Sequence, residues 1–295
     1  MIRYIKLRKI KTLQLDVTTV CQASCISCPR ETDLNFDKAI KHHLSINEIL
    51  KSFSEDQIKQ LDKMYLCGNY GEPAAGAYTQ DILRYFRKIN ATITLGMHTN
   101  GGLQSVGWWH DLGRILNHSN DYCVFSIDGL EDTNHIYRKN VNWNNIIANA
   151  ESYISAGGCA QWDMLVYKHN QHQVEDCEKL ARKMGFTWFR AKVSKRPYLN
   201  GLEAPVGWQP SGNQIGNIEC YALENNSVYM DAYGNVNPCC WHGMTYTPNA
   251  IIKNFDEIKA SWNTDSPDSI CQEACSVYKN KTNFKSQWQR EIQLR

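Results

Sequence analysis

The stretch TLQLDVTTVCQASCISCPR, residues 12–30, decides the fold prediction because a strand pattern runs directly into a metal-binding pattern. Its first six residues alternate apolar and polar side chains, as a half-buried β-strand does. Three cysteines follow in C-x3-C-x2-C spacing: Cys21, Cys25 and Cys28. Three thiolates on one short loop can hold a [4Fe–4S] cluster and leave its fourth iron without a protein ligand. Structural zinc usually takes four protein ligands, and zinc stays the alternative for this group.

Strand-like and helix-like runs alternate outward from this stretch as far as residue 193. The expected strands are 12–17, 64–67, 91–97, 122–127, 161–167 and 187–193. The expected helices are 45–61, which begins with a Ser45/Glu48 capping box, then 79–89, 105–116, 143–155 and 174–184. This alternation is typical of parallel strands joined by right-handed crossovers. Six repeats are too few for a closed eight-stranded barrel, so we expect an α/β fold with a partial (β/α)6 barrel.

The chain changes character near residue 200. Residues 197–216 are rich in proline and glycine and show no helical or strand periodicity, which is typical of a linker or a functional loop. We therefore expect two domains, a barrel over 1–200 and a small cysteine-rich domain over 201–295. The second domain should contain a β-hairpin, 228–230 and 236–239, with Gly234 in its turn.

Cysteine is the unusual feature of the composition, with twelve in 295 residues. No export signal precedes them and no apolar run reaches membrane-spanning length, so we expect a cytoplasmic protein in which clustered cysteines bind metal. A net charge of +2 gives no electrostatic case for a nucleic-acid partner. Seven cysteines fall into two groups. Four others are expected to be packing residues: Cys67, Cys123, Cys159 and Cys177.

The first cysteine group resembles the signature of the radical S-adenosylmethionine (SAM) superfamily over residues 18–30. Ser27 departs from the aromatic residue that this family usually has there, but removes no ligand. The resemblance implies that the open iron binds SAM, whose reductive cleavage gives a 5′-deoxyadenosyl radical that abstracts hydrogen from a substrate. Later motifs agree in order, and they imply that the cofactor-binding residues are Gly71, Glu72, Asn100, Ser126, Asp128 and Arg138. Glu72 would receive the methionine ammonium group of SAM, Ser126 the ribose and Arg138 the carboxylate.

The second cysteine group resembles the SPASM extension of the same superfamily in its shorter twitch form. Cys220-x13-Gly234-x4-Cys239 carries the likeness, followed by Cys271-x3-Cys275. The resemblance implies one auxiliary [4Fe–4S] cluster with four ligands: Cys220, Cys239, Cys271 and Cys275. Cys240 would point to the opposite face of a strand from its neighbour and is expected to be spare. A zinc site built from the same four cysteines is the alternative.

These resemblances imply a radical SAM enzyme of oxidoreductase type. Its expected substrate is a small polar metabolite or a peptide side chain, and its electron donor a flavodoxin or ferredoxin. The first strand starts early, which favours a small molecule or a peptide delivered by a separate partner. Candidate substrate contacts are Tyr70, His98, Lys192, Lys195, Arg196, Trp241 and His242. Two other functions stay open, an iron–sulfur electron carrier or redox sensor without SAM chemistry and a zinc-stabilised binding protein.

Overall fold

A nine-stranded sheet organises the part of the chain that the computed structural model describes, which is residues 10–34, 36–38, 40–194, 198–208, 217–244, 268–277 and 290–294. The strand order is β11-β6-β5-β4-β3-β2-β1-β8-β9. These strands are β1 (Thr12–Leu15), β2 (Lys63–Leu66), β3 (Thr94–Thr99), β4 (Tyr122–Ser126), β5 (Ala160–Val166), β6 (Trp188–Val193), β8 (Ser227–Met230), β9 (Val236–Asn237) and β11 (Arg290–Gln293). A separate antiparallel pair joins β7 (Asn217–Ile218) to β10 (Ser276–Val277).

The first six strands are parallel and neighbour one another in chain order, which confirms the predicted α/β fold. The register places Leu13 beside Met64, and Met64 beside Leu95, all fully buried. Among the described strands, β9 and β11 end the sheet without pairing with each other. The barrel is therefore partial, as predicted.

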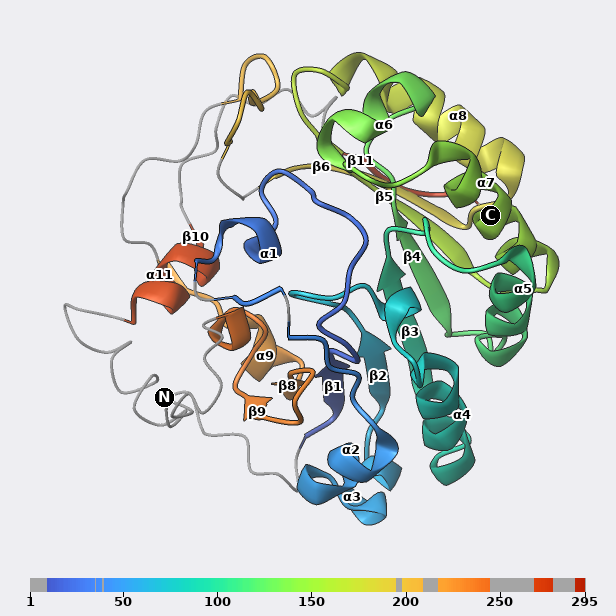
Figure 1. The fold of residues 1–295 in the computed structure, drawn as a ribbon, viewed down its shortest axis with the longest axis vertical. Helices are drawn as coiled ribbons and strands as arrows, with labels where there is room; N and C mark the ends of the chain where they lie inside the picture. The colour runs from blue at the N-terminus through green and yellow to red at the C-terminus, as the bar shows by residue number, and fades with distance from the viewer. Residues whose placement is uncertain are drawn as a thin grey trace.

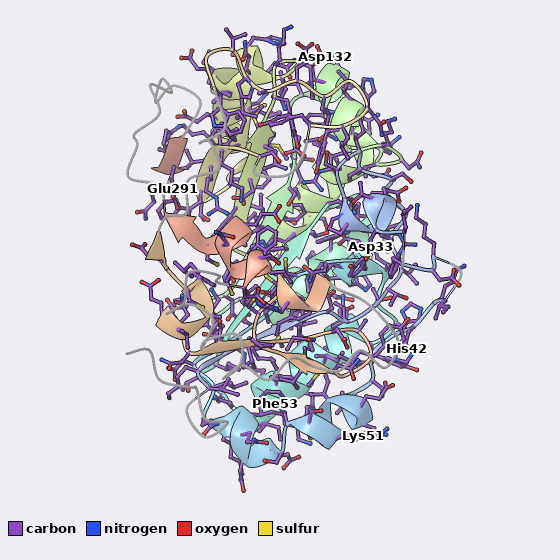
Figure 2. The ribbon with its side chains drawn as sticks, turned by 90° about the vertical axis from the view of Figure 1, so that its left-hand side faces the viewer. Asp33, His42, Lys51, Phe53, Asp132 and Glu291 are labelled. Atoms are coloured by element: carbon purple, nitrogen blue, oxygen red, sulfur yellow. The ribbon has the colours of Figure 1, made fainter. Side chains whose placement is uncertain are left out.

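The crossover helices lie on the outer side of the curved sheet (Figure 1). They are α2 (Ile46–Ser52), α3 (Glu55–Lys59), α4 (Thr79–Ile89), α5 (Val106–Ile115), α6 (Glu131–Tyr137), α7 (Trp143–Ser155) and α8 (Val174–Met184). Shorter helices are α1 (Pro29–Thr32), α9 (Tyr221–Glu224), α11 (Ser269–Cys275) and the 3₁₀ turns η2 (Pro73–Ala75), η3 (Gln171–Gln173) and η4 (His242–Met244). Figure 2 shows Lys51 of α2 near one end of the molecule and Asp132 of α6 at the other.

The helix expected over 45–61 is two helices, so that part of the prediction is wrong. The Ser45/Glu48 capping box starts α2 as expected. Phe53 then takes an extended conformation, with φ −128° and ψ 108°. Ser54 begins α3 with a second capping box to Gln57, because its side chain satisfies an N–H group that a continuous helix would pair internally.

The core accounts for two of the four cysteines expected to be packing residues. Cys123 and Cys177 are fully buried among apolar side chains. Cys159 is half-buried and contacts the Thr187 hydroxyl at 3.1 Å. Cys67 instead lines the large cavity described below, so its expected place in the core is wrong.

The predicted hairpin is joined to the barrel sheet. β8 pairs with β1 in parallel, and the Asp16 amide donates to the Met230 carbonyl at 2.9 Å. Gly234 lies in the turn with φ +82°, a conformation that favours glycine. β9 ends at Asn237, two residues before the predicted end, because Pro238 has no N–H to donate to the ladder. The boundary near residue 200 stays a prediction.

Candidate functional site

One cavity of about 570 Å³ gathers most of the predicted cofactor site. It lies where the loops leave the carboxyl ends of the parallel strands, the usual place for chemistry in such folds. The predicted residues on its wall are Cys21, Cys25, Cys28, Gly71, Glu72, Asn100, Ser126 and Arg138. Asp128 and the second cysteine group are not on this wall.

Arg30 of α1 fixes the position of the cysteine loop by hydrogen bonds to the backbone. This buried guanidinium donates to the Thr19 carbonyl and, at 3.1 Å, to the Tyr70 carbonyl. It also lies over the Phe36 ring, 5.2 Å from the ring centroid. Arg30 therefore ties the loop after β1 to the loop after β2, and its charge is compensated by carbonyl oxygens and a ring face.

Gly71 is required by a close approach of these two loops. A Cβ atom added there would lie 1.8 Å from the backbone oxygen of Thr18. The next amide, that of Glu72, donates to the Val20 carbonyl at 2.8 Å. The glycine thus brings the Glu72 backbone into hydrogen-bonding contact with the segment that leads into Cys21.

Glu72 is a buried carboxylate with fixed orientation. One oxygen accepts from the Thr99 hydroxyl and, at 3.2 Å, from the Ala74 amide; the other accepts from the Asn100 amide at 2.8 Å. Burial raises the pKa of Glu72, and these hydrogen bonds oppose that rise. A cationic group entering the cavity would restore its charge, which is the environment expected for a carboxylate that receives an ammonium ion.

Arg138 reaches the cavity with its orientation set by Asp128. The Arg138 Nε atom donates to Asp128 at 2.6 Å, and one Nη atom lies 3.9 Å from Cys25 Sγ. Burial alone would lower the pKa of Arg138, but the neighbouring Asp128 carboxylate raises it well above its usual value. Asp128 is fully buried and also accepts from the Leu165 amide at 2.6 Å. Asp128 therefore lies behind the cavity wall and fixes the orientation of Arg138, which is on the wall.

Asn100 and Ser126 complete the predicted set. Asn100 follows β3; its side chain accepts from Gln22 Nε2 at 2.8 Å and lies 3.9 Å from Cys21 Sγ. Ser126 is the last residue of β4. Both lie at strand ends that the parallel register brings to one edge of the sheet.

The three cysteines fit an iron–sulfur cluster as a donor set. All three sulfur-bearing side chains line one cavity, and soft thiolates suit iron–sulfur clusters. Burial raises the pKa of Cys21 to about 12 and also raises the pKa of Cys25. Without a metal these two thiols keep their protons at neutral pH, so cluster binding would release protons.

Four of the candidate substrate contacts line the same cavity: Tyr70, His98, Lys192 and Trp241. Burial lowers the pKa of His98 to about 4, so its ring is neutral at pH 7. His242 is not on the cavity wall, and Lys195 and Arg196 lie outside the described residues.

Sequence reasoning missed Asp163 on the cavity wall. This side chain on β5 pairs with Arg190 and, at 3.1 Å, with Lys192, both on β6. Burial alone would raise the pKa of Asp163, but these two cations hold it below its usual value. The 161–167 strand prediction contained the signal, because a charged residue in a strand of a barrel core points to a polar interior.

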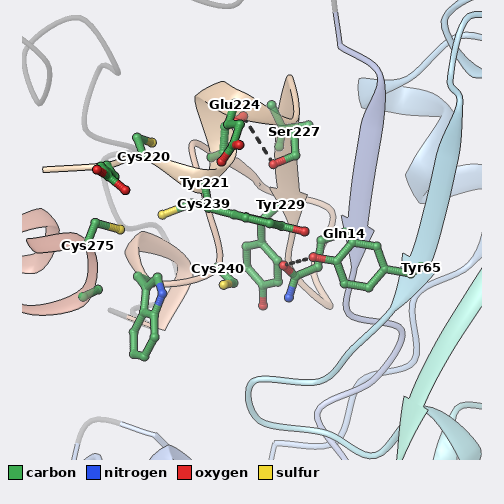
Figure 3. A pocket seen from close by; sticks show the side chains of 15 residues that line it. Gln14, Tyr65, Cys220, Tyr221, Glu224, Ser227, Tyr229, Cys239, Cys240 and Cys275 are labelled. Carbon is green, nitrogen blue, oxygen red and sulfur yellow. Dashed lines mark hydrogen bonds between the residues drawn. The ribbon is translucent and has the colours of Figure 1, made fainter. Parts of the chain in front are cut away.

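The second cysteine group lies around a smaller cavity of about 370 Å³. Its wall includes Cys220, Cys239 and Cys275 of the predicted set, together with Cys240. In Figure 3 the first three side chains approach one space from separate segments. Burial raises the pKa of Cys239 to about 12 and that of Cys240 to about 11.

The argument that made Cys240 spare assumed a strand through residue 239, which the structure does not have, so that Cys240 is spare stays a prediction. β9 ends at Asn237, and the chain turns at Cys239 and Cys240, so both side chains face the same cavity. Cys271 is on α11 but not on this wall; its sulfur lies 3.5 Å from His242 Nε2.

The two cavities are adjacent. Trp241 lines both of them. Asn69, on the first wall, donates from its side-chain amide to the Cys240 carbonyl at 2.8 Å. One tryptophan and one hydrogen bond therefore connect the two cysteine groups.

No helix among the described residues has the length and apolar character needed to cross a membrane. No protein-family model and no curated protein matches this sequence. Solved structures do match in fold.

Streptococcus suis SuiB bound to the precursor peptide SuiA superposes with a TM-score of 0.57 at 14% identity, covering 87% of this chain and 65% of that one. SuiB bound to S-adenosylmethionine gives 0.55 at 14% identity, covering 87% and 64%. Native anSMEcpe with bound AdoMet gives 0.53 at 17% identity, covering 81% and 75%. This chain thus spans slightly less than two thirds of the length of SuiB in these two structures. At these identities the likeness shows a shared fold.

Proposed function

We propose that this chain is a radical SAM enzyme, and one observation carries the proposal. Three cysteines, a buried carboxylate and a positioned arginine from three different segments line a single cavity. That combination matches the groups needed to hold a cluster and the two charged ends of an amino acid. The solved neighbours were crystallised with SAM, which supports the same ligand here.

Each group on the wall has a defined task in this proposal. Cys21, Cys25 and Cys28 hold a [4Fe–4S] cluster, which when reduced supplies the electron that cleaves the sulfonium of SAM. Glu72 accepts the methionine ammonium group, and the Nη atoms of Arg138 bind the carboxylate. Gly71 belongs to the turn that carries Glu72, Asn100 lines the wall beside it, Ser126 would contact the ribose, and Asp128 holds Arg138 in place.

We further propose one auxiliary [4Fe–4S] cluster in the second cavity, bound by Cys220, Cys239 and Cys275. The fourth ligand is either Cys271, as the resemblance implies, or Cys240, which shares the cavity. A closed cluster beside the first cavity suits acceptance of an electron from a substrate radical, and so an oxidative reaction. The electron donor is proposed to be a flavodoxin or ferredoxin.

A peptide side chain is the substrate class that the neighbours favour, since SuiB and anSMEcpe were each solved with a bound peptide. The Asp163–Lys192 pair gives the cavity a polar wall of both charges. That wall would also accept a small polar metabolite.

The decisive experiment is anaerobic reconstitution with iron and sulfide, reduction with dithionite, and detection of 5′-deoxyadenosine after SAM addition. Native protein should form the nucleoside and Cys25→Ala should form none. Cys177→Ala is the matched control, because that cysteine is buried away from both cavities and should leave the activity intact. A fully loaded, reduced protein that neither binds nor cleaves SAM would instead be an iron–sulfur electron carrier.

A further inference from the structure

Three ligand atoms converge beside the second cavity. They belong to His242 of η4, to Asp268 just before α11, and to Cys271 of α11. All three atoms lie within 4.8 Å of one another. The His242 Nε2 atom is 3.5 Å from Cys271 Sγ and 3.7 Å from Asp268 Oδ1. All three side chains are shielded from solvent, with His242 at 8% and Cys271 at 7% exposure.

A hydrogen-bonded relay does not account for this arrangement. A histidine that links an acid to a thiol uses its two ring nitrogens, one for each partner. Here both partners face the same atom, Nε2 of His242. The 3.7 Å separation from Asp268 also exceeds hydrogen-bond range.

A single bound cation does account for it. Tetrahedral zinc has bonds of roughly 2.0–2.3 Å, which place neighbouring ligand atoms about 3.4–3.6 Å apart. The two separations from His242 Nε2, 3.5 Å to Cys271 Sγ and 3.7 Å to Asp268 Oδ1, are close to these values. The donor set of thiolate, imidazole and carboxylate is one that zinc accepts.

We propose that His242, Asp268 and Cys271 bind one Zn²⁺ ion. A thiolate and a carboxylate neutralise the two positive charges, so the buried site carries no net charge. The fourth position is left for water. Cys271 then belongs to this site, and Cys240 is the fourth cysteine of the auxiliary cluster.

Asp268 is already oriented for this role. Its Oδ1 atom accepts from the Ile270 amide at 3.0 Å and from the Cys271 amide at 3.3 Å. Such supporting hydrogen bonds fix the geometry of metal-binding carboxylates. The ion would tie η4 to α11 and so hold the wall that carries Cys239 and Cys275.

The test uses the full chain, loaded anaerobically with iron and sulfide and then given zinc or cobalt(II). Elemental analysis should find one zinc per chain beside the iron, and cobalt should give sulfur-to-cobalt charge-transfer and d–d absorption bands. Cys271→Ser and His242→Ala should weaken zinc binding at least tenfold, because losing even a supporting partner costs about 10–100-fold. Both variants should keep the iron content of the native protein.

Two controls separate this site from zinc held in an empty cluster site. Cys220→Ala/Cys239→Ala should lose the auxiliary iron and still bind one zinc. Cys159→Ser should change neither metal, because that thiol contacts Thr187 away from both cavities. The proposal is overturned if Cys271→Ser loses iron and leaves zinc unchanged, since Cys271 would then be a cluster ligand. It is also overturned if native, iron-loaded protein binds no zinc or cobalt. Neither result bears on SAM cleavage, which is measured on the same samples.

Discussion

The Glu72 carboxylate is held by three hydrogen bonds in a buried wall, so its charge is available only to a ligand that enters the cavity. If it receives the ammonium group of SAM, Glu72→Gln removes a charged hydrogen bond worth about 1.5–3 kcal/mol. We expect iron-loaded Glu72→Gln to bind SAM at least tenfold more weakly in equilibrium dialysis. Glu203→Gln is the matched control, because Glu203 is 62% exposed on the surface and should leave the affinity unchanged. Equal affinity in the two variants would remove Glu72 from the SAM site.

The buried His98 imidazole makes the stability of the protein depend on pH. Its folded pKa of about 4 lies below the unfolded value of 6.5 because burial disfavours the cation. The unfolded chain therefore binds more protons between pH 4 and 6.5, and stability falls as the pH drops through that window. Between pH 7 and pH 5 the free energy of unfolding should decrease in both proteins. We expect this decrease to be about 1–2 kcal/mol smaller in His98→Gln than in the native protein. Urea titrations at both values would measure this, and parallel losses would show that His98 is not the group responsible.

Among the elements, the glycine turn after β2 is where one methyl group should matter most. Gly71→Ala would force a Cβ atom against the Thr18 carbonyl and push the turn from the cysteine loop. We expect a loss of about 3 kcal/mol in the free energy of unfolding and poor iron loading of Cys21, Cys25 and Cys28. Gly107→Ala lies in the exposed first turn of α5, where an added Cβ atom would make only an ordinary contact with Ser105 Oγ at 3.8 Å, and it should instead raise stability by about 0.5–1 kcal/mol. Denaturant curves for the two variants, with iron analysis, test the pair; equal effects would contradict the steric argument.

The local sequence pattern predicted many of the helices and strands of this fold. The 3.6-residue periodicity gave the bounds of α4, α7 and α8, and alternating strands and helices gave the order of β1 to β6. The candidate site followed because motifs at the ends of parallel strands must meet at one edge.

What could not be predicted depends on contacts between distant segments. β11 pairs with β6, and β8 with β1, across sequence that carries no local signal of either pairing. The strand expected through residue 239 ends at Asn237 because Pro238 cannot continue the ladder, and the meeting of His242 with Cys271 depends on how α11 packs.

At the scale of the whole molecule, the two cysteine groups are close neighbours although they are far apart in the sequence. Trp241 lines both cavities, and Asn69 connects the first wall to the Cys240 backbone. If both groups hold the proposed clusters, we expect the electron spins of the two reduced clusters to interact and broaden the electron paramagnetic resonance spectrum. Cys220→Ala/Cys239→Ala should give the narrow signal of a single cluster. Two independent, unbroadened signals from the native protein would mean that the clusters are farther apart than the shared wall indicates.

The pairing of β8 beside β1 also has a consequence for how the chain is made. A ribosome releases β1 long before residues 227–230, the strand that pairs along the outer edge of β1. Until then β1 presents unpaired backbone groups of the kind that attract other strands. Such a long-range contact is also slow to form. The outer edge of β1 therefore stays unpaired until the segment that carries the second cysteine group has been made. Completion of this part of the sheet and assembly of that cysteine group then both follow the synthesis of β1 to β6.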